Sequence, residues 1–204
     1  MTPRLVAISD RRSASASTTL ERFDELGRLA RPRSVVFQLR DLELGARERR
    51  AFAGEMSRIA RETEQFFVVN DRVDLAVLSG ADGVHLGERG MDTPDARKLL
   101  GANAFVSRAC HDPAEIASLE ADAVLLSPIL AARKGRPALG LDALSRAKGE
   151  LECAGRKTLL FALGGVSAND AAACVAAGAW GIAVIGAVLR GEGPELVRAL
   201  GLLR

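Results

Sequence analysis

The sequence predicts a parallel (β/α)8 barrel, the TIM-barrel fold, as a single domain over residues 1–204. Eight short apolar runs alternate with eight amphipathic stretches, and turn signals separate them. The apolar runs are almost continuously hydrophobic, which is typical of parallel strands covered on both faces. The first turn, residues 9–15, contains no glycine, and no G-x-G-x-x-G motif occurs, so a doubly wound sheet is disfavoured.

The elements follow from these runs in order. We expect strands at the apolar runs Leu5–Ile8, Val35–Leu39, Phe66–Val69, Gly83–Leu86, Ala104–Ala109, Ala123–Leu126, Thr158–Ala162 and Gly181–Ile185. We expect helices at the amphipathic stretches near Thr18–Leu29, Arg47–Glu62, Val73–Leu78, Thr93–Leu100, Pro113–Leu119, Leu141–Cys153, Ala168–Ala177 and Pro194–Leu200. Eight βα units then fill the chain and leave no linker for a second domain.

Composition narrows the classes of partner. The net charge is +2, with 48% hydrophobic and 26% charged residues, so we expect no nucleic-acid partner and no binding to a membrane surface. The three cysteines, Cys110, Cys153 and Cys174, are far apart and indicate reduced thiols rather than a disulfide framework. The N-terminus lacks the pattern of a signal peptide. Together these features predict a cytoplasmic protein that holds any anion by local contacts.

Two neighbouring strands end on polar residues. The third apolar run delivers Asn70 and Asp71, and the fourth ends at His85. All βα loops of a parallel barrel open on the face where the strands terminate, so we expect an active site there.

Glycines mark a second candidate feature. Gly164 and Gly165 follow the seventh strand, and Gly186 follows the eighth. In many barrels the backbone N–H groups of these two loops bind a phosphate, and glycine lets the backbone come close to it. The alternative is that the glycine pair only makes a tight turn.

Ordered motifs indicate a family. They are Gln38-Leu39-Arg40-Asp41-Leu42, Asn70-Asp71-Arg72-Val73-Asp74-Leu75-Ala76, Gly80-Ala81-Asp82-Gly83-Val84-His85-Leu86-Gly87, Ala109-Cys110-His111, Ser127-Pro128-Ile129, Gly164-Gly165-Val166 and the segment 178–184. With them the chain resembles the thiamine phosphate synthase and TenI (thiazole tautomerase) superfamily along nearly its whole length. The resemblance implies a barrel enzyme of thiamine biosynthesis that acts on a thiazole phosphate.

The synthase branch of this family couples a pyrimidine methyl diphosphate to a thiazole phosphate with Mg2+. Several of its residues are missing here. The strand-two lysine is replaced by Leu42, the second metal carboxylate by Gly90 and the strand-five serine by Ala109, while the loop at residues 130–134 lacks its hydroxyls. Each lost charge-assisted contact weakens diphosphate binding by about 1.5–3 kcal/mol. Asp92 stands two residues beyond the missing carboxylate.

The tautomerase branch fits the fifth strand better. By resemblance, Arg108 and His111 occupy the positions of its arginine and of the histidine that moves a proton on a thiazole carboxylate phosphate, a step without a metal. We therefore expect TenI-like aromatisation with no cofactor. The alternatives are a synthase that needs Mg2+, a catalytically silent barrel that binds a phosphorylated ligand, and an unrelated phosphate-sugar isomerase of the same fold.

The candidate residues follow. His111 and Arg40 are the candidate catalytic groups, and Asp71 is the candidate Mg2+ ligand. The substrate, a small phosphorylated heterocycle, is expected to contact Gln38, Arg40, Asn70, Arg108, Lys134, Gly164, Gly165 and Gly186. Other interpretations stay open: Asp71 bonding its own loop, His111 lying beside a helix N-cap, and His85 as a satisfied rim histidine. The leucine-rich C-terminal helix also suits a homodimer.

Overall fold

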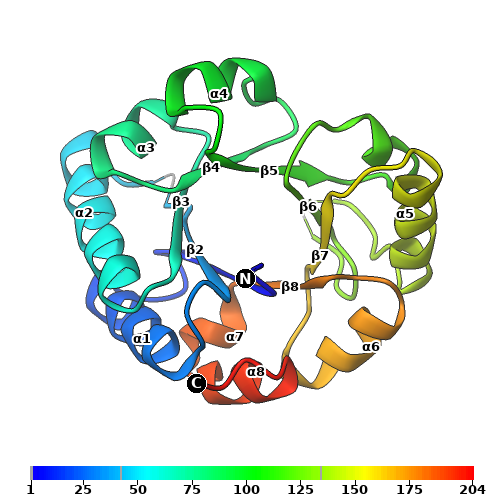
Figure 1. Ribbon diagram of the computed structural model, residues 1–204. Coiled ribbons are helices and arrows are strands. Elements are labelled where there is room, and N and C mark those ends of the chain that lie inside the picture. The colour runs from blue at the N-terminus through cyan, green and yellow to red at the C-terminus, as the bar shows by residue number, and fades with distance from the viewer. Residues whose placement is uncertain (1, 42, 134) are drawn as a thin grey trace.

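Eight parallel strands close into a barrel in the computed structural model, which describes residues 2–41, 43–133 and 135–204. Each strand pairs with its successor in the chain, and β8 returns to β1 (Figure 1). The strands are β1 (Leu5–Ile8), β2 (Val35–Leu39), β3 (Phe66–Asn70), β4 (Gly83–Leu86), β5 (Phe105–Cys110), β6 (Ala123–Leu126), β7 (Leu159–Leu163) and β8 (Gly181–Val184). The predicted fold class is confirmed.

Helices form the outer ring of the barrel in Figure 1. They are α1 (Ala16–Leu29), α2 (Ala46–Glu62), α3 (Val73–Ser79), α4 (Thr93–Leu100), α5 (Asp142–Cys153), α6 (Ala171–Ala176), α7 (Gly186–Leu189) and α8 (Gly193–Ala199). None of the helices in the described residues is long and apolar enough to cross a membrane.

Three connections differ from the expected helices. The stretch after β5 is a 3-10 helix, η1 (Pro113–Ser118), and the one after β7 begins as the 3-10 helix η2 (Ala168–Asp170). The short α7, directly after β8, was not predicted, because its four residues are too few to show a helical period. Gly186, which was expected to follow the eighth strand in a loop, is the first residue of this helix.

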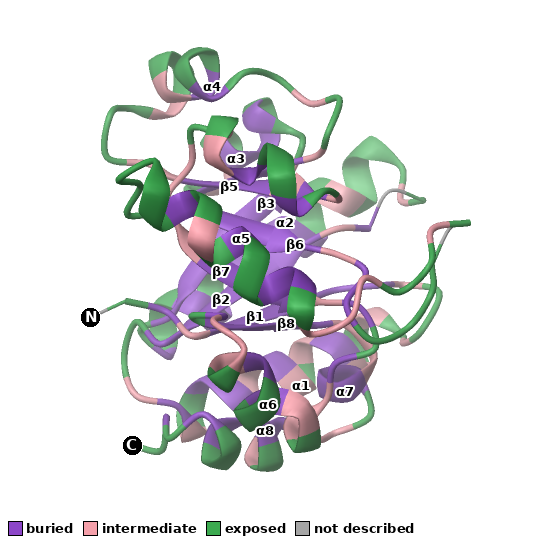
Figure 2. Cartoon of the chain, turned by 90° about the vertical axis from the view of Figure 1, so that its right-hand side faces the viewer, coloured by how far each residue is buried: buried purple, intermediate pink, exposed green. Residues whose placement is uncertain are grey.

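Side chains alternate between the inside of the barrel and the helix-covered outside. Val36, Val68, Leu125 and Phe161 belong to the inner cluster, whereas Phe37 packs with the residues beneath the helices. Figure 2 shows the strands buried and the outer faces of the helices exposed. This period of two decides which residues after each strand face the barrel mouth.

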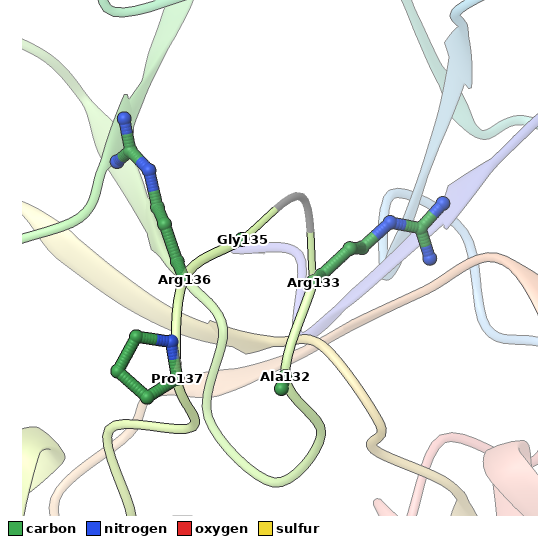
Figure 3. A pocket seen from close by; sticks show the side chains of 5 residues that line it. All are labelled: Ala132, Arg133, Gly135, Arg136 and Pro137. Carbon is green, nitrogen blue, oxygen red and sulfur yellow. The ribbon is translucent and has the colours of Figure 1, made fainter.

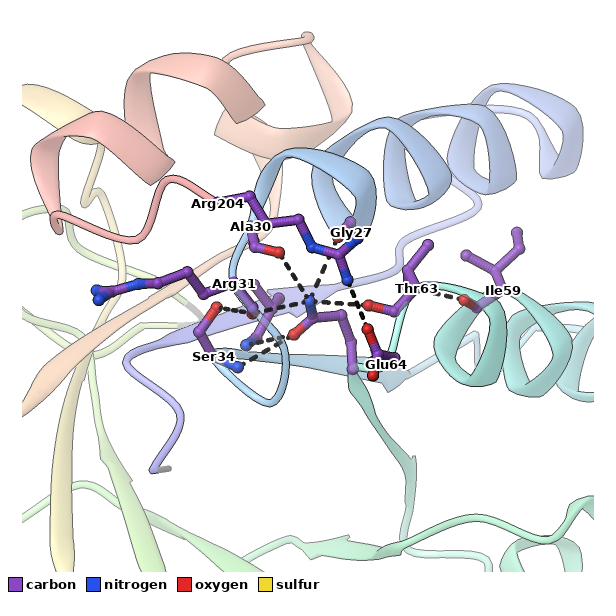
Figure 4. A network of polar contacts seen from close by, with 10 residues as sticks. Gly27, Ala30, Arg31, Ser34, Ile59, Thr63, Glu64 and Arg204 are labelled. Carbon is purple, nitrogen blue, oxygen red and sulfur yellow. Dashed lines mark hydrogen bonds and ion pairs between the residues drawn. The ribbon is translucent and has the colours of Figure 1, made fainter.

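A buried amide network lies at the amino-terminal ends of β2 and β3, opposite the barrel mouth (Figure 4). Gln65 accepts hydrogen bonds through Oε1 from the backbone N–H groups of Ser34 and Val35, at 3.1 and 3.0 Å. Its Nε2 lies 3.0–3.3 Å from the backbone carbonyls of Gly27, Ala30, Arg31 and Thr63. Both ends of this amide are satisfied, so Gln65 is a structural residue that ties α1 and α2 to β2 and β3.

Candidate functional site

A cavity of about 610 Å³ opens at the carboxyl ends of the strands. One part of its wall is apolar, with Ile8, Leu125, Leu163 and Ile185. The remaining lining side chains are mostly polar or charged: Gln38, Arg40, Asn70, Asp71, His85, Glu88, Arg89, His111, Ser127, Arg133 and Arg136. An apolar wall facing a polar one suits a flat heterocycle that carries charged groups.

A relay of hydrogen bonds orders the polar wall. The Asp71 carboxylate accepts from the backbone N–H of Gly87 at 2.7 Å and from Asn70 Nδ2 at 2.7 Å. Asn70 in turn accepts through Oδ1 from Gln38 Nε2, at 3.1 Å. An ionised carboxylate can only accept, so it fixes the direction of both amides.

This direction leaves Gln38 with an unused acceptor. The Gln38 side chain is 1% exposed, and its Oε1 has no hydrogen-bond partner. Buried polar atoms are satisfied in nearly all folded proteins, and an exception calls for an explanation. Because Gln38 lines the cavity, a ligand N–H or O–H group is the natural partner for Oε1.

His85 is buried in the same wall. Its Nδ1 lies 2.9 Å from Ser107 Oγ, and burial lowers the pKa of its imidazole to about 4. The ring is therefore neutral at pH 7. This agrees with the expectation of a satisfied rim histidine, although its place in the cavity wall lets it contact a ligand.

His111 reaches the cavity from the end of β5. Its Nδ1 donates to the backbone carbonyl of Ser127 at 2.7 Å, which leaves Nε2 as the unprotonated nitrogen of the neutral ring. Asp112 beside it is the N-cap of η1 and accepts from the Ala114 N–H at 2.9 Å. His111 therefore lines the cavity and also lies beside a helix N-cap, as the alternative interpretation expected.

Arg40 is positioned at the mouth by a buried contact. Its backbone N–H donates to Ser9 Oγ at 3.0 Å, and the Ser9 hydroxyl donates to the carboxylate of Asp41. Burial raises the pKa of this Asp41 carboxyl, and the Ser9 hydrogen bond opposes that shift. The Arg40 side chain lines the cavity and forms no ion pair within the described residues.

Two loops meet across the mouth. In the loop after β6, Arg133 and Arg136 exchange two backbone hydrogen bonds of 3.0 Å, and Figure 3 shows their side chains diverging from the two arms of this turn. Arg136 forms an ion pair of 3.0 Å with Glu88 in the loop after β4. This pair lowers the pKa of Glu88 through a hydrogen bond and the arginine charge. Lys134, an expected phosphate ligand, lies outside the described residues.

The glycines after β7 have a packing role of their own. The Gly164 carbonyl accepts from the Leu130 N–H at 2.8 Å, and a Cβ on Gly165 would lie 2.5 Å from the Cβ of Ala131. Both residues have positive φ, 101° and 74°. The alternative of a tight turn thus has structural support, while the phosphate role of Gly164, Gly165 and Gly186 stays a prediction.

Arg108 does not lie where it was expected. It occupies the outer face of β5, because the alternation turns Ser107 and Ala109 inward, and its Nη1 donates to the Met91 carbonyl at 3.0 Å. The side chain is 8% exposed and is not part of the cavity lining. Its expected contact with substrate is therefore corrected to a structural role beneath the loop that leads into α4.

The donor set for a metal is small. Asp71 is the one family carboxylate present, and a Cβ on Gly90 would lie 2.9 Å from its Oδ1, so position 90 does face Asp71. Asp92 is the N-cap of α4 and does not line the cavity. In the described ranges no three His, Cys, Asp or Glu side chains are grouped to hold a metal ion.

Five polar residues of the cavity wall were not among the expected ligands: Glu88, Arg89, Ser127, Arg133 and Arg136. Ser127 has the inward parity of Ala123 and Leu125, so the period of β6 could have placed it. Glu88 and Arg89 directly follow the fourth-strand motif. Arg136 carries no such signal, because the conformation of its loop decides where it points.

Comparison with known proteins identifies the family of the chain. A model of the TMP-TENI family, described as thiamine monophosphate synthase, matches residues 5–188. The chain belongs to this thiamine monophosphate synthase family. The expected membership is confirmed, and with it the expectation that the chain is an enzyme.

Relatives within the family are named thiamine-phosphate synthase. The one from Methanoculleus marisnigri is 35% identical over 185 residues, 87% of this chain and 85% of its own. The one from Moorella thermoacetica is 35% identical over 163 residues, 76% and 75%. The one from Gloeobacter violaceus is 35% identical over 172 residues and 82% of this chain, which spans 49% of that relative.

A solved family structure has the same fold. The thiamine phosphate pyrophosphorylase from Pyrococcus furiosus superposes with a TM-score of 0.79 at 24% identity, over 97% of this chain and 95% of that one. The preference for the tautomerase branch is not confirmed by these comparisons. The relatives carry the synthase name, so the synthase alternative fits better.

Proposed function

We propose that this chain is a thiamine phosphate synthase, which joins a hydroxymethylpyrimidine diphosphate to a thiazole phosphate and releases diphosphate. The relatives that cover most of the chain carry this name. The substitutions at Leu42, Gly90 and Ala109 argued for the other branch, but the cavity offers compensating charges. Arg40, Arg89, Arg133 and Arg136 line it against two carboxylates, Asp71 and Glu88.

The observation that carries the proposal is the free acceptor of Gln38. A relay that starts at a carboxylate leaves Gln38 Oε1 able to accept and unable to donate. The pyrimidine of thiamine carries an amino group, which is a donor. A thiazole carboxylate phosphate presents acceptors on its carboxylate and phosphate, and these would meet Oε1 unfavourably.

The chain's own groups then have distinct tasks. Ile8, Leu125, Leu163 and Ile185 would hold the ring away from water, while the guanidinium groups neutralise the diphosphate. The bond between the pyrimidine methylene carbon and the diphosphate oxygen breaks, and the diphosphate leaves with the electron pair. The thiazole nitrogen then forms the new bond to the methylene carbon.

The site fits Mg2+ with one protein carboxylate instead of the two that the synthases supply. A common Mg2+ site consists of one or two carboxylates together with substrate phosphate oxygens, so Asp71 alone would hold the metal on the protein side. The metal would supply further charge neutralisation for the leaving diphosphate.

A coupling assay tests the proposal. Both thiamine precursors are mixed with the protein, with and without Mg2+, and thiamine phosphate is measured by chromatography with fluorescence detection. We expect one diphosphate released for each thiamine phosphate formed, and faster turnover with Mg2+. Binding of both precursors without turnover would instead indicate a silent barrel.

Thiazole tautomerisation is the second candidate, and the geometry of His111 supports it. With Nδ1 donating to Ser127, Nε2 is free to accept a proton at the cavity wall. Aromatisation of thiazole carboxylate phosphate, without coupling to the pyrimidine, would favour this function. The cytoplasmic location and the homodimer stay predictions. The three cysteines are free in the described part of the chain.

A further inference from the structure

The ion pair between Glu88 and Arg136 spans the mouth of the cavity. It joins the loop after β4 to the loop after β6, which are 48 residues apart in sequence, and both side chains line the cavity. The backbone of Arg136 is held by two hydrogen bonds to Arg133, and Leu130 in the same loop donates to the Gly164 carbonyl. The guanidinium can therefore change partner by rotating its side chain alone.

Breaking the ion pair between Glu88 and Arg136 costs little free energy. The two side chains are 43% and 52% exposed, and solvent-exposed ion pairs contribute little stability. A diphosphate offers more negative charge than one carboxylate, and its oxygens match the fork of a guanidinium. An arriving diphosphate would thus compete well with Glu88 for Arg136.

The surrounding charges favour an anion at this point. Four arginines and two carboxylates line the cavity, an excess of two positive charges with the histidines left out. Position 90, which faces Asp71, contributes no carboxylate. The net positive charge at the mouth is therefore the charge of the arginine side chains.

We infer that Arg136 is a diphosphate-binding residue that Glu88 holds across the cavity mouth until the substrate arrives. This inference rests on the proposed synthase function and adds a ligand to its site. Glu88 is then the partner of Arg136 in the absence of substrate, and the diphosphate competes with it for the guanidinium group.

Calorimetric titration of the full chain with inorganic pyrophosphate, with and without Mg2+, tests the inference. Arg136→Gln is expected to weaken pyrophosphate binding by about ten- to hundred-fold. Glu88→Gln frees the arginine from its competitor, so binding is expected to become tighter. Arg198→Gln is the matched control, since Arg198 also forms an exposed ion pair of 3.0 Å, with Glu195 on α8, outside the cavity. The control is expected to change binding by less than about two-fold.

The outcomes separate the alternatives. Equal losses in Arg136→Gln and Glu88→Gln, with no further loss in the double variant, would show that the pair only braces the loops, and the inference would fail. Retention of binding in Arg136→Gln, or failure of the unaltered chain to bind pyrophosphate in either buffer, would also overturn it. Unchanged pyrophosphate binding in Arg136→Gln together with weaker binding of thiazole phosphate would assign Arg136 to the other substrate and would overturn the inference. The readout is independent of turnover, so a chain that binds pyrophosphate as expected but makes no thiamine phosphate would refute the proposed function alone.

Discussion

Gln38 Nε2 donates to Asn70 Oδ1 at 3.1 Å, and this contact determines which atom of Gln38 is left for a ligand. The chain contains a second buried glutamine, Gln65, whose amide is satisfied at both ends. Both polar atoms of the Gln65 amide have hydrogen-bond partners, whereas Oε1 of Gln38 has none. The difference supports the proposal that Gln38 binds a ligand, whereas Gln65 is a structural residue.

Replacing the two glutamines by methionine separates these roles. We expect Gln38→Met to raise KM for the pyrimidine diphosphate by about ten-fold, through loss of one hydrogen bond, with KM for the thiazole phosphate unchanged. Gln65→Met leaves the backbone N–H groups of Ser34 and Val35 unpaired, so it should lower the free energy of unfolding by about 3 kcal/mol and leave both KM values unaltered. Steady-state kinetics and urea unfolding measure the two effects. An unchanged pyrimidine KM in Gln38→Met would remove the main support for the synthase proposal.

The stability of the protein should depend on His85 at mildly acidic pH. Burial lowers its pKa from 6.5 to about 4, so between these values the unfolded chain binds a proton that the folded chain does not. This contribution to stability is therefore complete above pH 6.5 and is lost as the pH falls toward 4, by about 3 kcal/mol at most. The measurement is urea unfolding at several pH values, in the unaltered chain and in His85→Asn.

The His85→Asn curve should be flatter between pH 6.5 and 4. The buried Asp41 carboxyl, whose pKa is raised, is present in both proteins and cancels in the comparison. Parallel curves would mean that the imidazole is not held neutral by burial.

Position 90 allows a direct test of the metal site. A carboxylate there would face Asp71, so Gly90→Asp should increase the affinity for Mg2+ and make the melting temperature depend on the metal. Without Mg2+ the variant should be less stable by about 1–3 kcal/mol, because the added Cβ lies 2.9 Å from Asp71 Oδ1 and crowds it.

Gly90→Ala is the matched control for this test. It introduces the same Cβ without the carboxylate, so it should lose similar stability and gain no response to Mg2+. Thermal unfolding with and without the metal compares all three proteins. A Mg2+ response in Gly90→Ala as large as that in Gly90→Asp would show that the added carboxylate does not bind the metal.

The alternating apolar runs predicted the barrel, and the strand-end motifs placed Asn70, Asp71 and His85 at one face, because a parallel barrel brings all strand ends together. The period of two along β5 was also in the sequence, and it would have placed Arg108 outside the barrel. The free acceptor of Gln38 was not predictable, since it depends on the orientation of three side chains in contact. The Arg136–Glu88 pair was hidden for a similar reason: it depends on how two loops fold toward one another.

His111 distinguishes the two candidate functions. Its Nδ1–H is occupied by the Ser127 carbonyl, so any chemistry must use Nε2. Asparagine keeps a donor near the Nδ1 position and lacks Nε2. We therefore expect His111→Asn to fold normally and to lower kcat for thiazole aromatisation by about 100-fold or more, if the chain has this activity, because a proton-transfer group is lost. Coupling of the two precursors, which transfers no proton to the ring, should keep its rate within about ten-fold. Assays of both reactions on the same preparation measure the split, and equal loss in the two would assign His111 to substrate binding in place of proton transfer.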